Sequence, residues 1–254
     1  LLSLKPDPIT SSTPQNQAQP VSPEPVPEPV QPAEPEVPEI TEPVTPDEVV
    51  PPEEETPTPV PESVVLPNSL DTDSDGLTDI EEALLGTSLS LFDTDKDSYP
   101  DGTEIMGGFN PSGIGKISDT NIFKAFQSKR QGYSLIYPAA WSVQTITDSE
   151  ELIKININAQ ENITVTLESV TPGTKVNYWY MQKNPTENTS LLSAETIGSH
   201  AGTMSANKRS FSFIDDSKPE TVVTITYGVG DKSESSFMSI FDLIIKSFLF
   251  NSPA

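Results

Sequence analysis

Apolar and polar residues alternate with a period of two in two neighbouring segments of the C-terminal half. The segments are residues 153–157 and 163–167, and the stretch between them, 158–162, has the length of a hairpin turn. Since successive side chains of a strand point to opposite sides of a sheet, this alternation predicts two strands with one buried face. Strands are also expected at residues 132–137, 210–214 and 221–229.

A helical period replaces this alternation near the C-terminus. One apolar stripe at positions i, i+3, i+4 and i+7 predicts a helix over residues 236–245. The stripe consists of Phe237, Ile240, Phe241 and Ile244. A second helix is expected near residues 174–183, with Thr174 as its N-cap. These elements predict an α+β domain over residues 121–254, which is long enough to bury a core.

Residues 1–67 are rich in proline and acid, with 19 of the 26 prolines and 13 acidic residues. Proline fixes φ and lacks the amide donor, so we predict a disordered, locally polyproline II segment. The Pro-Glu alternation of residues 23–30 resembles the spacers of exported bacterial proteins. The segment is therefore interpreted as an acidic, proline-rich linker. A ligand for aromatic grooves and an inert tail are the alternatives.

The net charge of −24 is distributed unevenly, with −12 in residues 1–67, −10 in 68–111 and −2 in 112–254. Such acidity disfavours nucleic acid and anionic lipid, which are bound through Lys and Arg. It favours cations or basic partners. The chain has no cysteine, which rules out disulfides and thiolate metal sites.

The acidic middle segment repeats one pattern, in which residues 71–82 and 93–104 both carry carboxylates at positions 1, 3, 5, 9 and 12. This spacing is typical of a twelve-residue loop that surrounds one Ca²⁺ with oxygen atoms. In the first loop the expected ligands are the side chains of Asp71, Asp73, Asp75, Asp79 and Glu82 and the backbone carbonyl of Leu77. In the second loop they are the side chains of Asp93, Asp95, Asp97, Asp101 and Glu104 and the carbonyl of Tyr99.

The second site is expected to be the weaker of the two. Ser98 stands where the first loop has Gly76, so a non-glycine residue must make the sharp turn, and Lys96 adds a positive charge. Pro67 precedes the first loop and the outgoing helix, about 78–85, is short, so a calcium-sensing helix pair is not expected. The few apolar residues nearby cannot hold ten carboxylates together, so calcium should be structural.

The repeat resembles the bacterial form of the thrombospondin type 3 calcium repeat over residues 71–111. This resemblance implies an extracellular or surface module over residues 68–111. The Gly/Ser-rich composition of residues 112–120 predicts a linker after it. Dockerin modules, which bind scaffold proteins, also pair calcium loops at this spacing. A dockerin-like module is therefore the alternative.

The sequence around Tyr137-Pro138, with Trp141 three residues after the proline, is similar to the opening of PsbP-like domains. The closing segment, residues 246–250, is similar to the end of that family. The resemblance implies an antiparallel sheet with flanking helices and a domain that binds partners and is not an enzyme. No functional residue is carried over from it.

Catalytic motifs are few. His200 is the only histidine and is expected in a loop, while Asp215-Asp216 is expected in a turn. No Gly-x-Ser-x-Gly motif is present. The aromatic run 178–180 fits a partly buried helix, or else a surface that stacks on sugar or peptide. A hydrolase in the C-terminal domain is kept as an alternative.

We therefore expect a non-enzymatic, exported protein of the cell envelope or surface, with calcium and a protein or envelope component as its partners. The sequence contains no apolar stretch long enough to span a membrane. The segment Leu1–Leu4 fits the end of a signal peptide or anchoring helix, and a fragment edge is the alternative. Membrane attachment is expected only through such an anchor.

Overall fold

The computed structural model describes residues 67–251, so the predicted disordered linker lies outside the described residues except for Pro67. Within the described range the fold is α+β, as predicted. The four α-helices of this range are α1 (Asp79–Leu85), α2 (Asp101–Gly107), α3 (Val176–Lys183) and α4 (Met238–Ser247). Two short 3₁₀ helices are η1 (Ile117–Asp119) and η2 (Thr189–Leu191).

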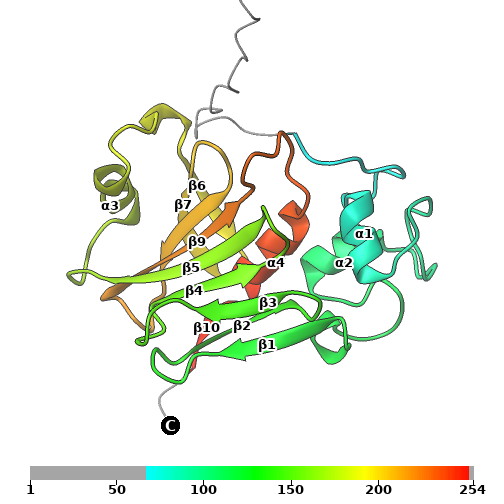
Figure 1. The fold of residues 1–254 in the computed structure, drawn as a ribbon, viewed down its shortest axis with the longest axis horizontal. Coiled ribbons are helices and arrows are strands. Elements are labelled where there is room, and N and C mark those ends of the chain that lie inside the picture. Colours follow the sequence, from blue (N-terminus) through cyan, green and yellow to red (C-terminus); the bar gives the residue numbers. More distant parts are fainter. Residues whose placement is uncertain (1–66, 252–254) are drawn as a thin grey trace, which may run out of the picture. The chain divides into compact units, whose positions relative to one another are not determined.

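The larger sheet has seven strands in the order β3-β4-β5-β9-β8-β7-β6, and every neighbouring pair is antiparallel (Figure 1). Its strands are β3 (Ser142–Thr145), β4 (Leu152–Asn156), β5 (Asn162–Ser169), β6 (Ser193–Ile197), β7 (His200–Met204), β8 (Ser210–Ile214) and β9 (Thr221–Gly228). A smaller antiparallel sheet has the order β1-β2-β10. It consists of β1 (Phe123–Gln127), β2 (Tyr133–Pro138) and β10 (Leu249–Phe250).

The period-two segments form β4 and β5, two neighbouring interior strands of the larger sheet. In the β4–β5 hairpin, Ile153 lies opposite Val165 and Ile155 opposite Ile163, and all four side chains are buried. Cross-strand pairs of β-branched residues on one face are a main source of sheet stability. The alternation therefore specifies both the strands and their register.

Helix α4 contributes the apolar stripe that the sequence predicts. Its buried side chains belong to the same apolar cluster as those of the sheet strands. Large buried apolar side chains each contribute about 1.5–3 kcal/mol of burial free energy. Leu77, Leu85 and Ile105 of the acidic segment belong to this cluster too. The acidic repeat and the sheet domain thus share one core, with α1 and α2 beside α4 in Figure 1.

Some local predictions are wrong. Thr174 is not the N-cap of α3, because Lys175 holds that position and the Thr174 hydroxyl donates to the carbonyl of Thr171 at 2.6 Å. Strands β1, β3, β6 and β7 were not predicted from the sequence pattern. The residues of the aromatic run 178–180 differ in burial. Tyr180 is buried and its hydroxyl donates a hydrogen bond to Glu187, whereas Tyr178 is exposed.

The prediction that His200 lies in a loop is wrong. His200 is the first residue of β7, and its side chain is buried. Its Nε2 atom lies 2.9 Å from the carbonyl oxygen of Phe248, and its ring packs 4.2 Å from that of Phe213. Nδ1 lies 3.8 Å from a carboxylate oxygen of Asp215. Because these contacts are made inside the core, His200 connects β7 to the end of α4.

Over residues 67–251, no helix is both long enough and apolar enough to cross a membrane.

Phe248→Ala tests this core. The Phe248 side chain is fully buried and stacks on Tyr133 at 5.0 Å, so its loss should lower the free energy of unfolding by about 3–5 kcal/mol. The neighbouring Leu249 is 55% exposed and serves as the control, with an expected loss of roughly 0.5 kcal/mol for Leu249→Ala. Urea unfolding measures both values, and equal losses would contradict the placement of the core.

Candidate metal centre

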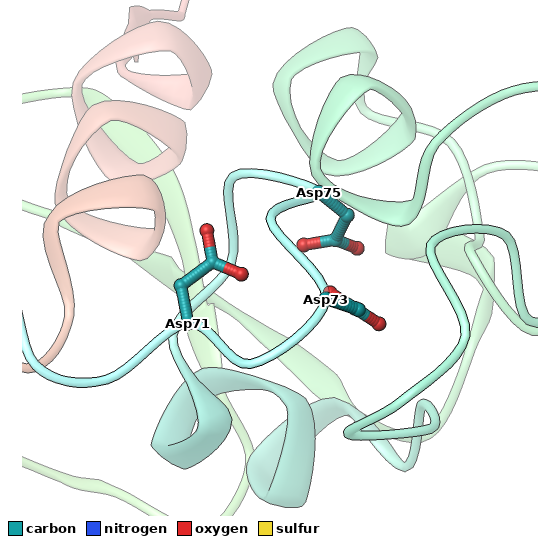
Figure 2. Close-up of side chains that lie close together, drawn as sticks. All are labelled: Asp71, Asp73 and Asp75. Atoms are coloured by element: carbon teal, nitrogen blue, oxygen red, sulfur yellow. The ribbon is translucent and has the colours of Figure 1, made fainter.

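The first acidic loop is folded by hydrogen bonds to its own carboxylates. Asp71 accepts the amides of Ser74 at 2.7 Å and Gly76 at 3.2 Å, and Asp75 accepts the amide of Leu77 at 2.7 Å. Gly76 has φ 101, a conformation that suits glycine. Figure 2 shows Asp71, Asp73 and Asp75 projecting from this single loop. One carboxylate oxygen of each lies within 4.8 Å of the others.

Several of these oxygens are buried without a partner in the protein. They are both carboxylate oxygens of Asp73, Oδ2 of Asp75 and both oxygens of Glu82. A buried, unpaired carboxylate is costly, and a cation removes that cost. Calcium–oxygen distances of about 2.3–2.6 Å place two ligands of one ion up to roughly 5 Å apart. The residues present therefore fit a calcium ion.

The second loop repeats the first with greater exposure. Asp93 accepts the amides of Lys96 at 2.7 Å and Ser98 at 2.9 Å, and Asp97 accepts that of Tyr99 at 3.0 Å. One oxygen each of Asp93, Asp95 and Asp97 lies within 4.8 Å of the others, but Asp97 is exposed whereas Asp75 is buried. The sharp turn at Ser98 is confirmed, with φ 85. Such strain in a non-glycine residue costs about 1–3 kcal/mol.

The two residues predicted to bind calcium through their backbone carbonyls, Leu77 and Tyr99, differ in the burial of their side chains. Leu77 is fully buried in the shared core, and Tyr99 is exposed. Leu77 thereby links its loop to the sheet domain, and Tyr99 makes no such link because its ring is exposed. This difference also favours a more rigid first loop.

The aspartates at loop position 9 brace their own loops. Asp79 accepts both the amide and the hydroxyl of Thr72, each at 2.9 Å. Asp101 accepts the amide of Thr94 at 2.9 Å and its hydroxyl at 2.6 Å. Asp79 joins none of the close carboxylate groups found in residues 67–251. Asp101, which the sequence assigns to the second loop, instead lies with carboxylates of the first.

The glutamates that close the loops are both buried. Glu82 has one oxygen within 4.8 Å of oxygens of Asp75 and Asp101. Glu104 has a buried Oε2 atom without a hydrogen-bond partner, although within the described part of the chain it belongs to no close group. The first site is therefore the better formed of the two.

Crowding changes the acidity of these groups. Burial, together with the neighbouring carboxylates, raises the pKa of Asp75 to about 6 and the pKa values of Glu82 and Glu104 to about 7. Burial likewise raises the pKa of Asp101. The protein without metal therefore favours protonation of these groups, and a bound cation would favour their ionisation.

Glu81 lies beside the ligands and was not singled out from the sequence. It completes a capping box with Thr78, whose amide donates to Oε2 of Glu81 at 3.0 Å. Its other oxygen accepts the amide of Ile240 at 3.0 Å, in the first turn of α4. One buried carboxylate thus caps two helices that are far apart in the sequence. The spacing Thr-x-x-Glu at the start of a helix is the signal that identifies the first role.

More hydrogen bonds hold the first loop on α4. The Ser239 hydroxyl donates to the carbonyl of Gly76 at 3.0 Å, and the Thr78 hydroxyl donates to the carbonyl of Ser236 at 2.7 Å. The ammonium group of Lys246 donates to the carbonyl of Met106 at the end of α2. The first loop is thus bonded to α4 and to the residues just before it, and α2, which follows the second loop, is bonded to the end of α4.

An open hollow of about 650 Å³ lies away from this centre, between α3 and the end of β5. Its lining includes Tyr178, which is 63% exposed, together with Trp179 and Lys183. The Lys183 ammonium is paired with Glu168 and lies 5.7 Å from the Trp179 ring centre. His200 does not line this hollow.

Comparison with known proteins finds no matching family model and no matching curated protein. The solution structure of the cyanobacterial PsbP protein (CyanoP) from Synechocystis sp. PCC 6803 is similar over 55% of this chain and 99% of its own, with 13% identity and a TM-score of 0.36. A crystal structure from Bacteroides thetaiotaomicron is similar over 51% of this chain, with 15% identity and a TM-score of 0.37. The chain spans about half of that protein, 48%. A PsbP structure is thus among the neighbours, whereas the thrombospondin type 3 resemblance stays a prediction.

The pKa values predict how stability depends on pH without metal. A raised carboxyl pKa stabilises the fold fully below the unfolded value and loses this effect as the pH rises through the folded value. For Glu82 the window runs from about 4.5 to about 7. In EDTA we therefore expect the melting temperature to fall across this window. Calcium should raise the melting temperature more at pH 8 than at pH 5, because it binds the ionised groups.

Circular dichroism melts between pH 5 and pH 8 measure this. Glu82→Gln is the control, since its neutral side chain should flatten the decrease seen in EDTA. A wild-type protein that gains stability across the window without metal would contradict the prediction.

Proposed function

We propose that residues 68–111 bind two calcium ions that have a structural role. The observation that supports this most directly is the set of five carboxylate oxygens of Asp73, Asp75 and Glu82 that are buried without a protein partner. In the paired-loop geometry a divalent cation supplies the missing contacts. Oxygen-only ligands favour Ca²⁺, which accepts six to eight oxygens in flexible geometry. The second ion binds more weakly, since its loop is more exposed and strained.

Calcium in this position stabilises more than the loops. The first loop shares the apolar core with the sheet domain, and Glu81 caps α4. An ion that orders the loop therefore also orders the start of α4. In this proposal the ions make the loops and the C-terminal domain one rigid unit, which resists proteolysis.

The C-terminal domain acts as a partner-binding domain, and not as an enzyme, in this proposal. The hollow beside α3, with the exposed Tyr178 and the ring of Trp179, offers a surface for such a partner. The burial of His200 among Phe213 and Phe248 favours a structural role for the histidine. The cell envelope or surface, where calcium is abundant, is the proposed location. The alternatives are a hydrolase and a dockerin-like scaffold module.

Calorimetric titration of calcium into metal-free protein tests the metal sites. We expect about two ions per chain, the second bound more weakly. Glu82→Gln removes a buried carboxylate of the first site and should weaken the tighter binding at least tenfold, about 1.4 kcal/mol. Asp119→Asn, an exposed aspartate outside the loops, is the matched control and should change nothing. The absence of calcium uptake at millimolar concentrations would refute the proposal.

Trp141 reports whether calcium stabilises the domain as well. Its ring centre lies 5.2 Å from that of Phe237, which directly precedes α4. The chain has two tryptophans, so the substitution Trp179→Phe leaves Trp141 as the single fluorescent reporter. We expect calcium to raise the melting midpoint of Trp141 fluorescence by about 5 °C or more.

Glu81→Ala removes the carboxylate that caps α4 and should reduce this calcium-dependent rise. The exposed Glu220→Ala is its control. A Trp141 midpoint that calcium leaves unchanged, in a protein that binds calcium, would show that the loops and the domain are not coupled.

A further inference from the structure

Asp101 belongs to the second loop by sequence but lies against the first. One of its carboxylate oxygens lies within 4.8 Å of oxygens of both Asp75 and Glu82, and all three residues are buried. We propose that Asp101 is a ligand of the first calcium ion, so that the two loops share one carboxylate. This inference rests on the proposed calcium function and concerns the ligand set of the first site.

Unsatisfied groups point to an ion at this position. Both oxygens of the fully buried Glu82 lack a hydrogen-bond partner, as does Oδ2 of Asp75. Three buried carboxylates this close repel one another unless they enclose a cation or are protonated. Their mutual distances fit ligands of a single calcium ion.

The backbone holds Asp101 in this place. A Cβ atom on Gly102 would lie 2.4 Å from the carbonyl oxygen of Asp75 and 3.2 Å from the carbonyl carbon of Gly76. Only glycine therefore allows the first turn of α2 to approach the first loop this closely. Gly102 thus has a role that the calcium-loop pattern alone does not indicate.

Asp101 also connects the first ion to the second loop. Its two oxygens accept the amide and the hydroxyl of Thr94, and each oxygen keeps a further lone pair for a metal. Thr94 stands between the ligands Asp93 and Asp95. An ion that fixes Asp101 therefore also orders the second loop. Asp79, the equivalent residue of the first loop, holds Thr72 in the same way but joins no carboxylate of the second loop.

Two equivalent backbone amides report on the loops separately. The amide of Gly76 donates to Asp71 in the first loop, and that of Ser98 donates to Asp93 in the second. Calcium titration of the full ¹⁵N-labelled chain, followed by NMR, gives a midpoint for each amide. In the wild type we expect the Gly76 midpoint at the lower calcium concentration.

Asp101→Asn and Asp97→Asn are the matched pair, because each removes one carboxylate charge from the second loop. Both should raise the Ser98 midpoint. Only Asp101→Asn should raise the Gly76 midpoint, about tenfold or more, because it alone removes a ligand of the first ion. The asparagine oxygen can still accept from Thr94, which preserves the loop.

Gly102→Ala provides an independent variant that keeps every carboxylate. It should also raise the Gly76 midpoint, since the added methyl group separates α2 from the first loop. A Gly76 midpoint that is unchanged in Asp101→Asn, or raised equally in Asp97→Asn, would overturn the shared ligand while leaving calcium binding intact. If neither amide signal of the wild type shifts when calcium is added, calcium binding itself is refuted.

Discussion

Buried carboxylates crowd together at the first acidic loop, where the loop packs against the core of the sheet domain. One carboxylate oxygen each of Asp75, Glu82 and Asp101 lies within 4.8 Å of the others, and several oxygens of Asp75 and Glu82 have no partner in the protein. Such an arrangement is stable only if the charge is neutralised, by protons or by a cation. The raised pKa values of these groups have the same cause, because burial and neighbouring negative charges disfavour the ionised form.

The loops are not an appendage of the sheet domain. Leu77 and Leu85 enter the common core, and Glu81 caps α1 and α4 together. The same short segment therefore contains carboxylates of the candidate metal site and side chains that pack against the sheet domain. Hydrogen bonds from Ile240 to Glu81 and from Ser239 to the carbonyl of Gly76 connect the loop to α4. The acidic repeat is thus placed to act as a structural support.

Much of the fold follows from local pattern. Regular alternation predicted β4 and β5, the stripe at Phe237 and Ile240 predicted α4, and the short helix expected near 78–85 is α1. The strands missed from the sequence include β3 and β6, which are the two edges of the larger sheet, and β1, an edge of the smaller one. Edge strands bury little on either face, so their sequences show weak alternation. Strand β7 was missed because Gly202 and His200 interrupt its pattern.

The chemistry proposed for this protein can be inferred from local spacing. Carboxylates at fixed positions, repeated after twenty-two residues, predict oxygen ligands for a hard cation. Which of these groups lie together is visible only in the folded chain. Glu81 reaches Ile240 across 159 positions of the chain, and Asp101 reaches the first loop because Gly102 leaves room for it. Spacing within a loop is a local property that a sequence displays, whereas contacts between distant segments arise only when the whole core is packed.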